Sequence, residues 1–293
     1  MKTLYKYWLV STNHLEDGVW FREESDFITG MNYVAVLAAV TGIDVFAFIL
    51  MSNHVHFVLG CSRDEAEWFV NEFKRRYSQY LRHKYGAVKY LKKNGVHIEE
   101  LPSDGESLER AIAYVVMNCV AAGICSHPSQ YDWGSGKYLF ATSSPKGKPL
   151  EEYSLHRKRV LLKTKESVPG NWLFSESGYI LPQSYVKVEF VEHSIFRNPQ
   201  RFNYFLNTSS KARRKMETDF SNLPSFRDQV IIAAIPDICR SLFDADSFKS
   251  LSENNQTEVL RQIRYRFSSN ADQLARVTGL SYAETVRLLD RYD

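Results

Sequence analysis

The chain has 293 residues, a length that fits two domains better than one small domain. Hydrophobic residues make up 44% and charged residues 24%, so most of the chain can bury a core and disorder is excluded as its overall state. No apolar run approaches the roughly 18 residues of a membrane-spanning helix, and the first apolar stretch is interrupted by Lys6. We therefore expect a cytoplasmic protein without a membrane partner.

The cysteines and the distribution of charge indicate which kinds of site the protein can contain. The four cysteines form no C-x-x-C pair, so we expect reduced thiols rather than a disulfide framework or a zinc ribbon. The formal net charge is only +3, but basic residues gather at 74–76, 157–159, 211–215 and 261–266. A nucleic-acid backbone favours such patches, although each one alone also fits a solvated helix face.

The first 140 residues alternate strand and helix signals. In chain order, the apolar and aromatic patterns predict a strand at 4–11, a helix from 27, two strands at 43–50 and 54–60, and amphipathic helices at 64–85 and 107–122. The small and polar stretch ATSSPKGKPL predicts a linker at 141–150. The sequence thus predicts one domain of mixed strands and helices over residues 1–140; the α+β class follows from the family resemblance described below.

Residues 151–293 read as a mainly helical region. Two short helices separated by Thr278 to Ser281 match a helix-turn-helix at 270–291, with Arg276, Tyr282 and Arg287 as candidate DNA contacts. Helical hairpins of this kind often only pack a core, so both interpretations stay open.

The sequence His54-Val55-His56 lies in a predicted strand. Residues two apart in a strand point to the same face, so the two imidazoles form a metal-binding pair. The alternative is a pair of histidines that are hydrogen-bonded within a crowded sheet.

Tyr114 and Asn118 are separated by four residues on a predicted helix and project from one face. If this helix packs beside the histidine strand, two nitrogens, an amide oxygen and a phenol converge on one cation. Such a donor set with open positions suits Mg²⁺ or Mn²⁺ bound to a phosphate, and the tyrosine could then attack it to give a 5′-phosphotyrosine. Taken alone, Tyr114 also fits a half-buried core position.

Three blocks in order resemble the REP-associated tyrosine transposases, which are single-tyrosine HUH endonucleases. MSNHVHFVL resembles their P-N-H-V-H block, AYVVMNCVAAGICSHPSQYDWGSGKY resembles their Y-I-x-x-N-P-V-x-A-G block with its Y-x-W-S-S-Y continuation, and FKRRYSQYLRHKYG resembles their basic helix. The blocks cover about residues 1–140. Cys119 replaces the usual proline, Met51 and Ser52 replace the usual residues before Asn53, and the tryptophan-arginine segment is not evident in 86–100.

The resemblance implies a ferredoxin-like core with a central antiparallel sheet, His54, His56 and Asn118 as metal ligands and Tyr114 as nucleophile. It also implies cleavage and rejoining of single-stranded DNA at hairpins, by a monomer or a homodimer.

Other residues and functions compete with this interpretation. Tyr77 is the alternative nucleophile, and the neighbouring basic residues are expected to hold the DNA backbone: Arg75, Arg76, Arg82 and Lys84. The alternative functions are a domesticated hairpin-binding regulator without catalysis, a rolling-circle initiator or relaxase-type nuclease, and a metal-dependent hydrolase of a small molecule.

Overall fold

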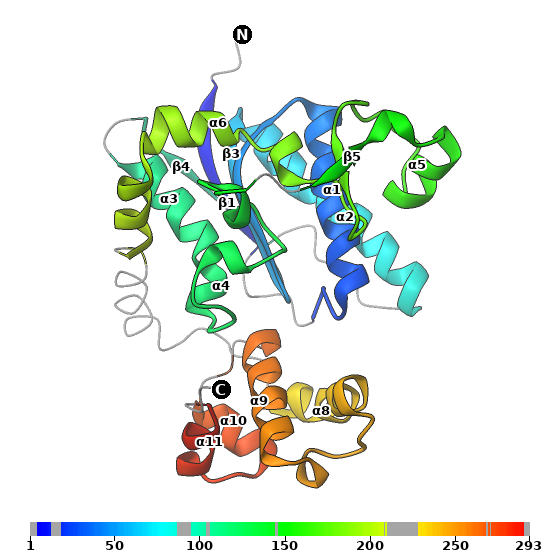
Figure 1. The fold of residues 1–293 in the computed structure, drawn as a ribbon, viewed down its shortest axis with the longest axis vertical. Coiled ribbons are helices and arrows are strands. Elements are labelled where there is room, and N and C mark those ends of the chain that lie inside the picture. The colour runs from blue at the N-terminus through cyan, green and yellow to red at the C-terminus, as the bar shows by residue number, and fades with distance from the viewer. Residues whose placement is uncertain are drawn as a thin grey trace.

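The computed structural model describes residues 5–12, 19–86, 95–103, 106–143, 146–207, 209, 228–267, 269 and 271–289. Over these residues the chain forms a four-stranded sheet with helices on both faces and a second, helical unit (Figure 1). The expected mixed α+β class is confirmed. Within the described part of the chain, no helix is both long and apolar enough to cross a membrane.

The sheet contains β1 (Lys6–Thr12), β2 (Asp44–Met51), β3 (His54–Cys61) and β4 (Val96–Leu101) in the order β2-β3-β1-β4, and each neighbouring pair is antiparallel. Helix α1 (Glu24–Thr41) connects β1 to β2, and α2 (Arg63–Tyr85) connects β3 to β4. β3 therefore has a paired strand on each side.

Side chains of β3 alternate between two cores on opposite faces of the sheet. Val55, Phe57 and Leu59 pack into the core formed with α1 and α2. Val58 packs into the other core, which is formed with α3 (Ser107–Val116) and with α4 (Asn118–Ala121). The even-numbered residues His54 and His56 share the face of Val58, and α3 lies over that face (Figure 1).

Residues 146–207 belong to the sheet unit rather than to a separate region. β5 (Gly147–Pro149) pairs with β6 (Leu173–Ser175), so the predicted linker ends in a strand; its residues 144 and 145 lie outside the described residues. Ile180 and Tyr185 are buried in the core of α1 and α2, whereas Phe196 is buried in the core of α3. This segment thus completes both cores of the sheet unit, on the C-terminal side of the linker expected at 141–150.

Several short elements join these parts. They are α5 (Leu155–Leu162), α6 (Val188–Phe190), a π-helix (Val191–Phe196), helical residues 199–207, and 3-10 turns at Pro128–Gln130, Gly136–Tyr138, Leu150–Glu152, Pro182–Ser184 and Phe248–Ser250.

The C-terminal unit consists of α8 (Asp228–Phe243), α9 (Glu253–Phe267), α10 (Ala271–Thr278) and α11 (Tyr282–Leu289) around its own core. Helices α10 and α11 form a hairpin, and Gly279 between them has a φ of 73°, which favours glycine. The hairpin falls within the predicted 270–291; residues 270, 290 and 291 and the basic cluster at 211–215 lie outside the described residues.

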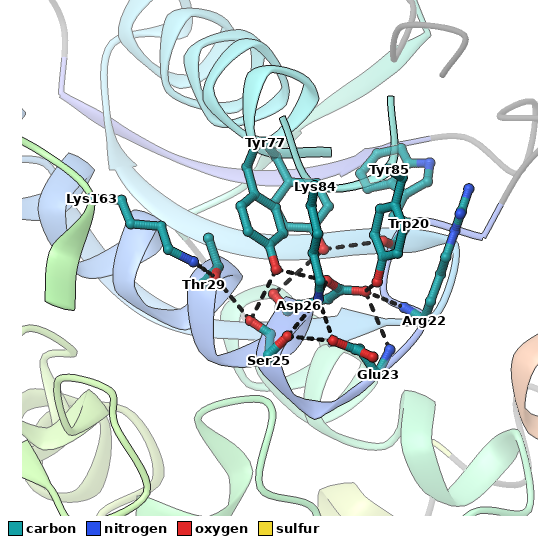
Figure 2. Close-up of polar contacts among 11 residues, drawn as sticks. Trp20, Arg22, Glu23, Ser25, Asp26, Thr29, Tyr77, Lys84, Tyr85 and Lys163 are labelled. Atoms are coloured by element: carbon teal, nitrogen blue, oxygen red, sulfur yellow. Dashed lines mark hydrogen bonds and ion pairs between the residues drawn. The ribbon is translucent and has the colours of Figure 1, made fainter. Parts of the chain in front are cut away.

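Asp26 joins the start of α1 to the end of α2. Its carboxylate is fully buried and accepts hydrogen bonds from the Arg22 amide (2.9 Å), the Tyr80 and Tyr85 hydroxyls (2.8 and 2.9 Å) and the Lys84 ammonium (2.7 Å) (Figure 2). Burial by itself would raise the pKa of Asp26, but the hydrogen bonds from Lys84, Tyr80 and Arg22 outweigh it and lower the pKa. The folded state therefore favours the charged carboxylate.

We expect Asp26→Asn to lower the free energy of unfolding by about 2–3 kcal/mol at neutral pH, because an amide accepts fewer of these hydrogen bonds and leaves Lys84 without its buried anion. Since the pKa of Asp26 is lowered on folding, the stability it contributes is present above the ordinary carboxyl pKa and is lost as the pH falls through the folded value. The difference between variant and parent should therefore shrink in acid.

Denaturant unfolding at neutral and acidic pH measures this difference, with Asp64→Asn at an exposed position of α2 as the matched control. A deficit of the same size at both pH values would contradict the role given to the Asp26 charge.

Candidate functional site

His54 and His56 form a buried pair on β3. Their side chains are 3% and 4% exposed, and the ring centroids lie 4.9 Å apart with the planes nearly perpendicular. Both rings point to the α3 face of the sheet, as the two-residue spacing predicts.

Asn53 orients the first of these rings. Its side-chain oxygen lies 2.7 Å from Nδ1 of His54 and accepts a hydrogen bond from the tautomer that is protonated on Nδ1. In that tautomer the lone pair of His54 resides on Nε2. A second-shell acceptor that fixes the tautomer in this way is typical of metal-ligating histidines. Asn53 sits in the two-residue turn between β2 and β3, so the hairpin itself supplies the orientation.

Helix α3 brings Tyr114 to the histidines. The Tyr114 and His56 ring centroids lie 5.5 Å apart at 88°, an edge-to-face contact. Tyr114 is partly exposed, whereas its neighbours Ala113 and Val115 are fully buried. The expected packing of this helix on the histidine strand is therefore present, with the phenol at the border between core and solvent.

Asn118 begins α4, one turn beyond Tyr114, and is 2% exposed. Its side-chain nitrogen donates to the carbonyl oxygens of Tyr114 (2.9 Å) and Val115 (3.3 Å). These bonds fix the plane of the amide with its nitrogen toward α3 and its oxygen on the opposite side.

Two histidines on one strand are too few protein ligands to hold a metal ion by themselves. Within the ranges that the structure describes, no three His, Cys, Asp or Glu side chains lie close enough to hold a metal. A site at His54 and His56 therefore needs a third ligand of another type, such as an amide oxygen. Two imidazoles and an amide leave coordination positions for water and a phosphate.

Tyr77 lies on the other face of the sheet, in the core of α1 and α2. Its side chain is fully buried, and its hydroxyl donates to the carbonyl oxygen of Trp20 at 3.0 Å (Figure 2). Burial raises the pKa of Tyr77 well above its ordinary value. The proposed alternative nucleophile is thus a core hydroxyl, and a nucleic acid cannot reach it without unfolding of this region.

The basic residues of α2 are engaged on the same far face. Arg75 pairs with Glu72 at 2.6 Å, and Arg76 pairs with both Glu72 and Glu166. Lys84 belongs to the Asp26 cluster, while Arg82 is exposed near the end of the helix. Because α2 covers the face opposite His54 and His56, these residues do not line the histidine site as DNA contacts.

The candidate contacts of the C-terminal hairpin have different surroundings. Arg276 pairs with Asp228 at 3.0 Å and Arg287 with Glu253 at 2.9 Å, so each arginine holds α10 or α11 to a neighbouring helix. Tyr282 is 57% exposed at the start of α11.

The C-terminal unit also contacts the turn that precedes the histidines. The Ser52 hydroxyl donates to the carbonyl oxygen of Arg266 at 2.6 Å, near the end of α9. The helical unit is thereby joined to the β2–β3 turn one residue before Asn53.

Sequence reasoning missed two polar neighbours of His56. Ser11 on β1 is paired directly with His56, and His97 on β4 is paired directly with Ser11. All three share one face, and the His97 side chain is 57% exposed at the sheet edge. The alternation in VHIEEL at 96–101 was the available signal for β4, but the pairing partner could not be read from it.

Comparisons with known proteins do not assign this chain to a family. No family model matches the chain, and no curated protein matches it. Among solved structures, it is similar to a REP-associated tyrosine transposase bound to a REP hairpin, with 12% identity, a TM-score of 0.38, and coverage of 48% of this chain and 85% of that chain. A likeness at this TM-score assigns neither an activity nor a site.

We expect Tyr77→Phe to lower the free energy of unfolding by about 1 kcal/mol, because the buried carbonyl of Trp20 loses its donor while the ring stays packed. Thermal or denaturant unfolding measures the change, and Tyr282→Phe at an exposed position is the matched control. An unaltered stability of Tyr77→Phe would show that this hydroxyl is not part of the core network.

Proposed function

We propose that this protein is a metal-dependent single-stranded DNA endonuclease and strand transferase of the single-tyrosine HUH type that acts on hairpin DNA. Tyr114 is the nucleophile, His54 and His56 are metal ligands, and Asn118 is the third protein ligand. The observation that carries the proposal is the contact between the Tyr114 ring and His56, beside a His54 ring oriented by Asn53.

The order of elements supports this assignment. The β-α-β-β-α-β succession and the strand order β4-β1-β3-β2 support the ferredoxin-like core that the resemblance implies. In this arrangement the histidine strand lies in the sheet interior and the tyrosine helix covers one face, with both linking helices on the other.

Mg²⁺ or Mn²⁺ bound at His54, His56 and Asn118 would polarise a scissile phosphate. Tyr114 performs the group transfer. Its oxygen attacks the phosphorus and gives up its proton to solvent, the bond from phosphorus to the 3′ oxygen breaks, and that oxygen leaves as a protonated 3′-hydroxyl. The resulting 5′-phosphotyrosine keeps a phosphodiester bond. Attack by another 3′-hydroxyl reverses the step and joins two strands without an external energy source.

The surroundings of the site supply a path for the nucleic acid. Ser11 and His97 extend a polar row from His56 to the open edge of the sheet, where a strand could lie against hydrogen-bonding side chains. The α10–α11 hairpin would bind duplex DNA as a helix-turn-helix. It belongs to the C-terminal unit, which is hydrogen-bonded to the β2–β3 turn. With Arg276 and Arg287 held in ion pairs, Tyr282 is the exposed candidate contact of that hairpin.

Tyr114→Phe should abolish covalent attachment to DNA and retain hairpin binding, because only the attacking oxygen is removed. The assay is incubation with labelled single-stranded hairpin DNA and Mn²⁺, followed by denaturing electrophoresis and mapping of the adduct. Tyr204→Phe, with the same atom removed at an exposed residue to which no DNA contact is assigned, should still form the adduct. Hairpin binding by the parent protein without any adduct would favour the non-catalytic regulator, and an adduct in Tyr114→Phe would refute the assigned nucleophile.

His54→Ala should weaken Mn²⁺ binding at least tenfold, since even loss of a residue that merely supports a ligand costs about 10–100-fold. Isothermal titration with Mn²⁺ measures this without DNA, and His156→Ala on the exposed face of α5 is the matched control. Equal Mn²⁺ affinity of the two variants would exclude His54 as a ligand.

A further inference from the structure

A cavity of 680 Å³ lies on the sheet face opposite His54 and His56, where the ends of α2 and α5 meet α1. Its lining is asymmetric in charge. Among the described residues it includes Lys84, Lys163 and His83 but no aspartate or glutamate, and Tyr33 and Tyr80 supply aromatic walls. A lining of this kind favours an anion.

The two lysines differ in how their charges are compensated. Lys84 directs its ammonium group to Glu23, to the Ser25 hydroxyl at 2.5 Å and to Asp26 at 2.7 Å, so its three donors are used within the protein (Figure 2). Lys84 therefore forms part of the fixed wall and is not the group that would bind a ligand.

Lys163 instead contacts an uncharged hydroxyl and an aromatic ring. Its ammonium group donates to the Thr29 hydroxyl at 2.8 Å (Figure 2). It also lies 4.3 Å from the centroid of the Tyr80 ring. In the part of the chain that the structure describes, no carboxylate is in ion-pair contact with Lys163. Burial and the nearby charge of Lys84 lower the pKa of Lys163, so an incoming anion would stabilise its charged form.

The backbone at Lys163 is also unusual. This residue follows the last turn of α5 with φ 52° and ψ 36°, the left-handed conformation that glycine adopts at lower cost. From there the side chain reaches to α1, as the bond to Thr29 shows. A glycine at this position would relieve the backbone strain but would remove the amine from the cavity. The strained backbone therefore coincides with a side chain that places a positive charge in the cavity.

We propose that this cavity is a second ligand site that binds a phosphate group, with Lys163 as the principal cation. The volume lies within the roughly 300–1,000 Å³ of small-molecule sites, and the tyrosine walls give room for the base or sugar of a nucleotide. The phosphate can belong to a mononucleotide or to the backbone of a bound strand. The site is on the other sheet face from Tyr114, so its occupancy does not require cleavage.

Isothermal titration in EDTA tests the site, with inorganic phosphate, thymidine monophosphate and a short oligothymidylate as separate probes. Lys163→Met should weaken binding about tenfold or more, as expected for loss of one charge-assisted hydrogen bond. Lys165→Met makes the same change two residues away, at a lysine that does not line the cavity, and should bind like the parent. Lys163→Arg should restore most of the affinity, which separates loss of charge from damage to the fold.

The probes distinguish the two sources of phosphate. Tighter binding of the mononucleotide than of the oligonucleotide identifies a small ligand, and the reverse identifies a DNA strand. The proposal is overturned if no probe binds the parent protein at millimolar concentration, or if Lys163→Met and Lys165→Met lose affinity equally. The titration is done in EDTA, so it does not depend on the proposed metal, and Tyr114→Phe should bind these probes like the parent. The phosphate-site proposal and the cleavage proposal can therefore be refuted independently of each other.

Discussion

The position of β3 constrains the rest of the molecule. A strand that is paired on both sides and covered on both faces must bury every side chain it carries, and all eight residues of His54–Cys61 are buried. Its odd-numbered residues are apolar and find partners on α1 and α2. Its even-numbered residues include two imidazoles, whose burial costs free energy unless other groups satisfy them. On the α3 face, His54 is hydrogen-bonded by Asn53 and His56 contacts Tyr114, and the proposed cation would bind both imidazoles.

This division gives the two faces of the sheet separate chemistries. On one face, α3 places a phenol against His56, and α4 begins with an amide one turn farther along the chain. On the other, the ends of α1 and α2 are joined by a buried carboxylate and bordered by a cationic cavity. The basic residues of α2 stabilise the second face through ion pairs, which explains why a helix rich in arginine and lysine does not line the histidine site.

The chain that follows the four-stranded sheet in sequence joins these parts. Residues 146–207 supply apolar side chains to both cores, and the turn before Asn53 is bonded to the end of α9. The β2–β3 hairpin, which carries the two histidines, is thus contacted by segments that follow it in sequence. A DNA substrate gripped by the helical unit would lie next to the β2–β3 turn, which offers a physical link between binding and the proposed transfer at Tyr114.

Local periodicity was enough for some of these features. The side-chain periodicity of strands and helices predicts that His54 and His56 share one face of a strand and that Tyr114 and Asn118 lie one helical turn apart. The same periodicity predicts the alternation of strands with helices and the two short helices at the end of the chain. The tertiary structure alone decided that β4 pairs with β1, that Tyr77 is buried, that residues 146–207 complete the cores, and that Lys163 reaches α1. These features join residues far apart in sequence, and the identity of such partners is fixed by packing and register rather than by any local pattern.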